Sequence, residues 1–207
     1  MHTNYHPQST EVRTPPVWPR KWLNVVILAL LVSAHPVTAP EGHAQDSFSE
    51  YQVKAAYLFN FLKFVEWPEE AFADPLAPLV IGIVGDDPFG DALPQVVAGK
   101  TVQGRDLVIR KYRAGEDLRG SHILFISGSE KKRLPQLLSS LDGSCVLTVA
   151  DVDGFLEEGG MILLFSEQNR VRFAINVEAA TQAKWKISSK LLSLARVAGG
   201  KGKEGGY

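Results

Sequence analysis

The sequence predicts an α/β protein with a Rossmann-like, mostly parallel sheet and flanking helices, ending in an antiparallel hairpin followed by a long helix. Short apolar runs that hardly alternate are separated by helix-like segments, which is typical of strands buried on both faces of a parallel sheet. Near the end, two further runs are joined by a short polar link, which indicates the hairpin. At 207 residues, with 22% charged residues and a net charge of −1, the chain is long enough to bury one core.

Residues 1–44 are interpreted as a signal peptide that precedes the folded domain. Three basic residues come before the uncharged run of residues 22–34, and small residues stand three positions and one position before a cleavage site after Ala44. Cleavage after Ala39 is less favourable because a proline follows it. The alternative is a retained membrane anchor, although the apolar run is shorter than the roughly 20 residues that cross a bilayer.

Residues 45–198 are expected to form one α/β domain that opens with an aromatic helix over residues 49–68. Apolar residues recur there at three- and four-residue spacing, Ser49 suits the N-cap position, and Pro68 suits the end. A helix this aromatic must be largely covered by the rest of the protein. The strands expected after it are residues 79–84, 107–111, 122–127 and 145–149, and the helices are residues 88–98 and 130–141.

The C-terminal part is expected to differ from these alternating units. Residues 161–166 and 171–177 form the hairpin, and the second run alternates between apolar and more polar residues, so that one of its faces is packed. The long helix covers residues 178–197, where apolar residues form a stripe at helical spacing. Residues 199–207 are interpreted as a flexible, glycine-rich tail.

The segment LVIGIVGDDPFG, residues 79–90, has the strand, glycine turn and helix start of a phosphate-binding loop. It lacks both GxGxxG and GK[ST], and Asp86 and Asp87 stand where an anion would dock. Asp87 followed by Pro88 is instead interpreted as the N-cap and first residue of a helix. We therefore expect no nucleotide cofactor.

Catalytic and metal chemistry have little support in the sequence. The acidic residues 151–160 lack the spacing of a calcium loop and are interpreted as a solvated turn. His122, the only histidine after residue 44, and Cys145, the only cysteine, each open an apolar strand, which favours packed residues over a base or a nucleophile. With no GxSxG motif and no basic face, the chain is expected to be neither an enzyme nor a nucleic-acid binder, with no cofactor or metal.

Polar or aromatic residues on otherwise apolar elements form the candidate partner or ligand surface. Burial of such groups costs free energy unless they are paired. The preferred interpretation is internal fastening, with Asn60 capping backbone groups and Arg172 bridging to Glu178 or to an aspartate; the alternative is a surface that faces a partner or a ligand. The candidates are Asn60, Lys63, Arg172, Asn176, Trp185 and Lys186.

The expected long helix also carries a basic, aromatic patch, made of Lys184, Trp185, Lys186 and Lys190. Two interpretations are open. The patch is a solvated face, or it docks onto an acidic sensor domain, since tryptophan and basic residues anchor protein interfaces well.

Five segments, taken in order, closely resemble the YfiR family of exported proteins and cover nearly all of residues 51–197. The segments are YQVKAAYLFNFLKFVEWP, VIGIVGDDPFGDAL, GSHILFIS, VLTVADVDGFLEEGGMILLF and VRFAINVEAATQAKWKISSKLLSLARV. The resemblance implies a small periplasmic α/β protein, usually a homodimer, without enzymatic activity. It implies a regulator that binds the periplasmic sensor domain of an inner-membrane diguanylate cyclase, inhibits the cyclase and so lowers cyclic di-GMP.

The resemblance leaves the partner open. An outer-membrane lipoprotein can sequester such a regulator, and other members sit beside sensor kinases or outer-membrane receptors. The alternative function is therefore an envelope small-molecule-binding protein acting with such a partner, with the aromatic first helix lining the pocket. Gly120-Ser121 stands where family members commonly have Gly-Cys, and Cys145 is the only thiol, so redox sensing by a disulfide within the chain is not expected.

Overall fold

The computed structural model describes residues 42–72, 74–113, 115–183 and 185–198. The expected signal peptide lies outside these ranges except for its last three residues, and the expected tail over residues 199–207 lies wholly outside them. Within these ranges, we find no helix with the length and apolar character that crossing a bilayer requires.

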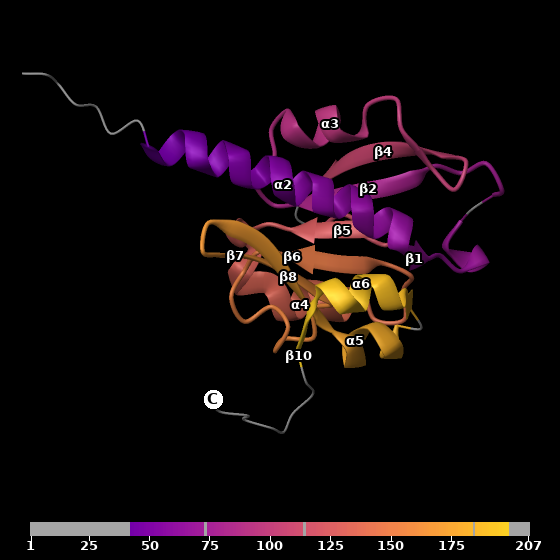
Figure 1. Cartoon of the computed structure of the whole chain (residues 1–207). Coiled ribbons are helices and arrows are strands. Elements are labelled where there is room, and N and C mark those ends of the chain that lie inside the picture. The colour runs from indigo at the N-terminus through magenta and orange to yellow at the C-terminus, as the bar shows by residue number, and fades with distance from the viewer. Residues whose placement is uncertain (1–41, 73, 114, 184, 199–207) are drawn as a thin grey trace, which may run out of the picture. The chain divides into compact units, whose positions relative to one another are not determined.

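An eight-stranded sheet with the order β10-β8-β7-β6-β5-β2-β4-β3 forms the centre of the fold (Figure 1). β8 (Arg170–Asn176) runs antiparallel to its neighbour β7 and makes the expected hairpin with it. The predicted fold class, a mostly parallel sheet with flanking helices, is confirmed. The mutually parallel strands are β4 (Arg105–Tyr112), β2 (Leu79–Val84), β5 (Ile123–Ile126), β6 (Leu147–Ala150) and β7 (Ile162–Glu167).

Several short strands lie beyond the predicted ones. β3 (Thr101–Val102) pairs antiparallel with β4 at one edge of the sheet, and β10 (Arg196–Ala198) pairs parallel with β8 at the other. A separate pair joins β1 (Val65–Glu66) to β9 (Lys186–Ile187). Runs of two or three residues carry no periodic signal, so only tertiary pairing could have revealed them.

The two faces of the sheet bury separate apolar clusters, because successive side chains of a strand point to opposite faces. Ile123 and Phe125 of β5 pack on the face covered by α2, whereas Leu124 and Ile126 pack on the face covered by α4. Figure 1 shows α2 running across the sheet. The helices are α2 (Gly42–Phe64), α3 (Ala92–Val97) and α6 (Ser189–Leu194) on the first face, and α4 (Leu134–Ser140), preceded by the 3₁₀ helix η2 (Gly128–Arg133), on the second.

The predicted aromatic helix is α2, and its buried stripe includes Leu58, Phe61 and Leu62. Its ends differ from the prediction. Ser49 lies inside the helix and is not its N-cap, and the helix stops before Pro68 because the two residues of β1 pair with β9. Just beyond, the indole Nε1 of Trp67 donates a hydrogen bond to the backbone oxygen of Leu62 at 3.2 Å, and a 3₁₀ turn, η1 (Glu69–Ala71), follows.

The helix expected from Pro88 begins only at α3, so the predicted N-cap role of Asp87 is wrong. Asp87 Oδ1 accepts a hydrogen bond from the backbone N–H of Phe89 at 2.9 Å and closes a local turn. Gly90 then adopts a positive φ of 51°. A right-handed helix cannot pass through a residue in that conformation, so the helix starts after it.

The single long helix expected over residues 178–197 is also wrong. The chain forms α5 (Val177–Gln182), then β9, α6 and β10. Trp185 is only 6% exposed, and its ring packs edge-on against Trp67 with 4.6 Å between centroids. Ile187 pairs with β1. Burial of the indole and strand pairing outweigh the helical propensity of this segment.

Because the expected C-terminal helix is interrupted, α6 has an N-cap of its own, and loss of this cap should lower the stability of the protein. Ser188 Oγ accepts a hydrogen bond from the backbone N–H of Leu191 at 3.2 Å and caps the helix. The substitution Ser188→Ala should lower the free energy of unfolding by about 1 kcal/mol, as loss of a serine cap does. Urea unfolding followed by circular dichroism measures it.

Ser189→Ala is the matched control, because Ser189 is exposed and lies one residue further on. It should change stability by only a few tenths of a kcal/mol, since alanine is the better helix former. In one continuous helix both substitutions would be equally mild, so equal effects would contradict the break.

Candidate functional site

The carboxyl ends of β2 and β5 meet where the strand order reverses, which is where open α/β sheets usually bind ligands. Gly85 follows β2 with a φ of 89°, and a side chain there would collide with the Ser129 hydroxyl. That hydroxyl accepts a hydrogen bond from the backbone N–H of Asp86 at 2.9 Å. Asp87 Oδ2 pairs with Lys111 Nζ at 2.7 Å. The turn therefore uses the Asp86 N–H and the Asp87 carboxylate within the protein.

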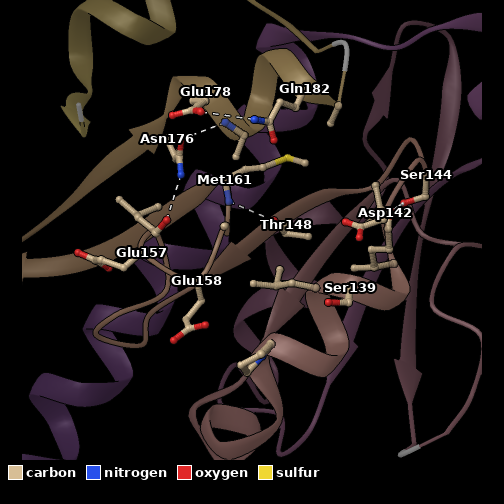
Figure 2. A pocket seen from close by; sticks show the side chains of 18 of the residues that line it. Ser139, Asp142, Ser144, Thr148, Glu157, Glu158, Met161, Asn176, Glu178 and Gln182 are labelled. Carbon is tan, nitrogen blue, oxygen red and sulfur yellow. Dashed lines mark hydrogen bonds between the residues drawn. The ribbon is translucent and has the colours of Figure 1, made fainter. Parts of the chain in front are cut away.

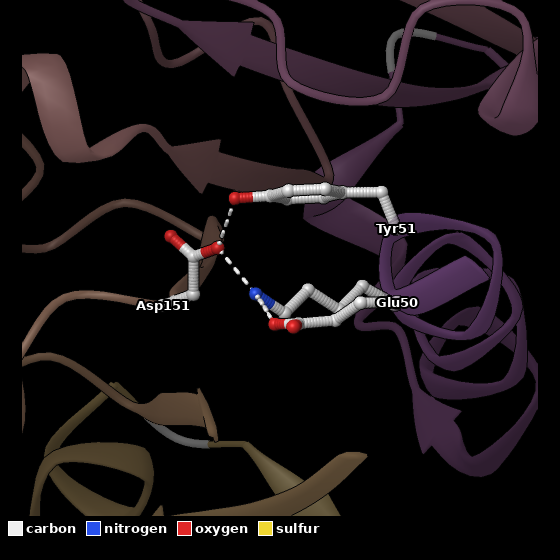
Figure 3. Close-up of polar contacts among 4 residues, drawn as sticks. Glu50, Tyr51 and Asp151 are labelled. Atoms are coloured by element: carbon white, nitrogen blue, oxygen red, sulfur yellow. Dashed lines mark hydrogen bonds and ion pairs between the residues drawn. The ribbon is translucent and has the colours of Figure 1, made fainter. Parts of the chain in front are cut away.

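Beside this turn, Glu50, Tyr51, Lys54 and Asp151 form a charged network, here named the Lys54 cluster (Figure 3). Lys54 Nζ lies 2.7 Å from Asp151 Oδ2 and 2.6 Å from Glu50 Oε1. The Tyr51 hydroxyl donates to the same Asp151 oxygen at 2.9 Å. Since Asp151 follows β6 and the other three residues belong to one stretch of α2, the cluster joins the helix to the carboxyl end of the sheet.

Burial makes the Lys54 cluster energetically sensitive. The Lys54 side chain is 5% exposed and that of Asp151 is 9% exposed. Two charges removed from water are tolerated only when they compensate each other. Burial and the negative charge of Asp151 raise the pKa of Tyr51 well above its usual range, so this hydroxyl stays protonated and donates. Burial alone would raise the pKa of Glu50, but Lys54 outweighs it and the pKa of Glu50 falls.

The Lys54 cluster corrects the interpretation of residues 151–160 as a solvated turn. Asp153 and Gly154 are exposed, but Asp151 is partly buried, with its side chain only 9% exposed, and is paired. A signal was present in the sequence, because Lys54 follows Glu50 by four residues and precedes the buried Leu58 by four. A lysine on the covered stripe of an aromatic helix needs a carboxylate partner. The identity of Asp151 as that partner required the fold.

Asn60, Lys63 and Lys186 lie near the C-terminal end of α2. Asn60 is partly buried, and Lys63 is exposed with its Nζ 5.5 Å from the centre of the Phe59 ring. Lys186 is exposed in β9, where it stands opposite Glu66 just beyond the end of α2. Among the described residues, the Asn60 side chain makes no hydrogen bond that would cap a backbone group.

Two more lysines lie over aromatic rings of the C-terminal half of α2. Lys100 Nζ lies 4.7 Å from the centre of the Phe59 ring, and Lys190 Nζ lies 5.3 Å from the centre of the Phe64 ring. We name Phe59, Lys63, Phe64, Lys100 and Lys190 the basic-aromatic surface. Its residues come from α2, from the turn after α3 and from α6. The patch expected on a single C-terminal helix is not formed; Lys184 lies outside the described residues, and Trp185 is buried.

Arg172 and Asn176 lie on β8, away from the basic-aromatic surface. Arg172 Nε pairs with Glu167 Oε2 at 3.0 Å across the hairpin, and not with Glu178 or an aspartate as expected. Asn176 is an internal fastener. Its Oδ1 accepts from the backbone N–H of Ala179 at 3.0 Å and caps α5, while its Nδ2 donates to the backbone oxygen of Leu156 at 3.0 Å.

His122 is a packed residue at the start of β5. It is 6% exposed, and its Nδ1 accepts a hydrogen bond from the backbone N–H of Val80 at 3.0 Å. The rings of Trp67 and Phe72 pack against it, with centroids 5.5 and 4.8 Å away. Burial lowers the pKa of His122, and the positive charge of Arg105 adds to the effect. The imidazole therefore remains neutral at physiological pH.

A pocket of about 1070 Å³ opens on the α4 side of the sheet (Figure 2). Its wall residues come from α4, α5, the loop before β6, the turn before β7 and the end of β10. Of the candidate residues from the sequence, Asn176 lines it. The lining of this pocket contains no residue of α2, the aromatic helix that was expected to line a ligand pocket. Within the described ranges, no three metal-ligating side chains come together to hold an ion.

The family model described as YfiR/HmsC-like matches residues 51–196, which is more than half of the chain. The chain belongs to this family. The resemblance drawn from the five sequence segments is thereby confirmed. The YfiR/HmsC-like match runs from Tyr51 in α2 to the start of β10. It includes three of the four residues of the Lys54 cluster and leaves out only Glu50.

The solved structures that match the chain include one at low sequence identity. It is described as a conserved domain protein from Vibrio cholerae O1 biovar eltor, and the two share 12% sequence identity with a TM-score of 0.49. The match covers 71% of this chain and 59% of the other, so this chain spans less than two thirds of that protein. The comparison with curated proteins found no match.

The Lys54 cluster predicts a large stability loss when one partner is removed. Asp151→Ala should lower the free energy of unfolding by about 3 kcal/mol, the lower end of the range for breaking a buried ion pair, because the Lys54 ammonium loses one of its two carboxylates and keeps Glu50. The double variant Lys54→Met/Asp151→Leu should lose clearly less, since it removes both charges. Urea unfolding of the three chains measures this. A double variant as unstable as Asp151→Ala would contradict the view that the incompletely paired buried charge causes the loss of stability.

His122 predicts a pH dependence of stability. Its folded pKa lies below the unfolded value of about 6.5, so the unfolded chain takes up a proton first as the pH falls. The free energy of unfolding should therefore be constant above that value and decrease below it. His122→Asn keeps an acceptor for the Val80 N–H and removes the titration. It should flatten the profile between about pH 7 and pH 5, where carboxylates titrate little. An unchanged profile would rule out His122 as its source.

Proposed function

We propose that this chain is a periplasmic, non-enzymatic regulator that binds the periplasmic sensor domain of an inner-membrane signalling protein. The first partner to consider is a diguanylate cyclase, which the regulator would inhibit and so lower cyclic di-GMP. It would act by favouring one conformation of the sensor domain and shifting its population. The observation that carries the proposal is the YfiR/HmsC-like match over residues 51–196.

The polar groups of the structure fit a binding role. At the carboxyl edge of the sheet, where an α/β enzyme would hold a ligand, the Lys54 cluster and Asp87 engage their charges in internal pairs. His122, the only histidine after residue 44, is packed among aromatic rings. These groups therefore stabilise the fold, and recognition is left to the surface.

The basic-aromatic surface is the face that we assign to the partner. Its three lysines are exposed, and none of them pairs with a carboxylate among the described residues. Phe59 and Phe64 are partly buried beneath the ammonium groups. Aromatic rings with basic neighbours are typical anchors of interfaces, and positive charge speeds the encounter with an acidic domain. Asn60, Lys63 and Lys186 from the sequence-based set lie at this end of α2.

The proposal predicts a loss of partner binding on charge reversal. Lys63→Glu/Lys190→Glu should weaken binding to the sensor domain at least about tenfold, mainly through slower association, and the remaining binding should depend less on salt. Surface plasmon resonance against the purified periplasmic domains of cyclases and kinases encoded nearby measures it.

Lys131→Glu/Lys132→Glu is the matched control, because both lysines are exposed on η2 and the change in net charge is the same. It should leave the affinity for the sensor domain within about twofold, because exposed charges outside the interface contribute little to binding. If the unaltered chain binds no such domain, and its deletion leaves cyclic di-GMP unchanged in cells, the proposal fails.

A second candidate function is an envelope small-molecule-binding protein that acts with a sensor kinase or an outer-membrane receptor. The pocket of about 1070 Å³ favours it, because clefts of this size are typical of ligand sites. The two functions are compatible, since a ligand can tune the affinity for a protein partner. Homodimerisation and sequestration by an outer-membrane lipoprotein remain proposals drawn from the family.

A further inference from the structure

The pocket on the α4 side combines a buried floor with a charged rim. Val146, Thr148 and Leu156 are buried and form part of the floor, and Met161 stands beside them. Figure 2 shows the labelled carboxylates distributed around Thr148 and Met161, on opposite sides of the hollow. The rim carboxylates are Asp142, Glu157, Glu158 and Glu178.

The rim is strongly unbalanced in charge. All four of its carboxylates are exposed, and none takes part in an ion pair among the described residues. The described lining contains no lysine, arginine or histidine. Four like charges around a cleft with low-dielectric walls focus a negative potential into it and raise the local concentration of cations. The chain as a whole has a net charge of only −1, so this concentration of acid is local.

A second feature of the pocket is independent of the acids. Thr148 is 2% exposed, and its Oγ1 accepts a hydrogen bond from the backbone N–H of Met161 at 3.2 Å (Figure 2). A hydroxyl has one proton and two lone pairs, so one lone pair and the proton are still unused. Among the described residues neither has a partner. The Thr148 hydroxyl is satisfied by this one bond, and its remaining proton and lone pair can still form a hydrogen bond with a polar group of a molecule that enters the pocket.

The spacing of the acids selects the kind of cation. Since no three ligating side chains within the described ranges come together to hold a metal ion, the rim does not form a chelating site. Carboxylates on several sides of an apolar floor match a longer molecule with charged nitrogens separated by methylene groups. Its ammonium groups would meet Glu157, Glu158 and Glu178, and its methylene chain would cover Leu156 and Val146. A nitrogen near the middle would donate to the free lone pair of Thr148.

We propose that this pocket binds a linear aliphatic polyamine. The site is separate from the basic-aromatic surface, which has the opposite charge and lies on α2, α6 and the turn after α3. The inference does not depend on the proposed protein partner, so that either can fail alone. For the second candidate function, small-molecule binding, it specifies polyamines as the ligand class and the pocket on the α4 side as the site.

Calorimetric titration with spermidine tests the proposal. At about 0.15 M salt, where loose attraction to surface charge is screened, spermidine should bind saturably with one molecule per chain. Glu157→Gln/Glu158→Gln should weaken the binding at least about tenfold, because it removes two rim charges and leaves the apolar floor intact.

Glu69→Gln/Glu70→Gln is the matched control. These are also two adjacent, exposed glutamates, but they lie on η1, outside the pocket. The control variant should bind spermidine within about twofold of the unaltered chain. Mg²⁺ at equal ionic strength should compete poorly, because it cannot reach acids on several sides of the floor or cover that floor.

Three results would overturn the inference. One is the absence of saturable spermidine binding. Another is an equal loss of affinity in the pocket variant and the control variant, because binding would then follow net charge. The third is loss of the spermidine binding signal when Mg²⁺ is added at equal ionic strength. Thermal unfolding of each variant checks that it is folded, which is expected for exposed glutamates.

Discussion

The ion pair between Lys54 and Asp151 is the constraint that organises this molecule. It lies where α2 passes the carboxyl end of β6, and both side chains are almost excluded from water. Apolar packing holds α2 on the sheet, but such packing tolerates sliding and rotation. The Lys54 ammonium pairs with Glu50 on its own helix and with Asp151 after β6, and only the pair with Asp151 opposes sliding and rotation of α2 on the sheet. Tyr51 reinforces the position of α2 through its hydrogen bond to the same Asp151 oxygen.

The position of α2 in turn determines what the rest of the surface presents. Phe59 and Phe64 stand at the edges of the covered stripe, where a lysine from the turn after α3 and a lysine from α6 reach their rings. The helix covers one face of the sheet, and α4 covers only part of the other, which leaves the pocket between α4 and α5. One face thus carries basic groups around aromatic rings, and the other carries acids around an apolar floor. The two binding proposals rest on this difference in charge.

Much of the fold could be predicted because its main strands are long enough to carry a pattern. β2, β5 and β6 are buried along nearly their whole length, as their non-alternating sequences indicated. The errors fall where tertiary contacts override local preference. The segment around Trp185 has the apolar spacing of a helix, yet the indole is buried against Trp67 and the neighbouring residues pair with β1. Neither contact has a local signature.

The candidate sites were less accessible from the sequence. Asn176 makes internal hydrogen bonds, as the fastening interpretation expects, and it also lines the pocket, as the alternative expects. The Lys54 cluster, the basic-aromatic surface and the pocket each join residues that are distant in sequence, so that no spacing rule applies to them. The acids of residues 151–160 show the limit of sequence interpretation, since the Asp151 side chain is largely covered and paired whereas Glu157 and Glu158 stand exposed on a rim. Composition cannot separate these cases, because burial is a property of the fold.

The pairing of β1 with β9 has a consequence for the order in which the protein assembles. Val65 meets Ile187, and Trp67 packs against Trp185, so the end of the first helix contacts a segment that is made more than a hundred residues later. Contacts of such large sequence separation form slowly, because a long loop must close before they gain anything. The aromatic side of α2 therefore remains incompletely covered until almost the whole chain is present. During that interval its apolar residues are open to a chaperone or to self-association.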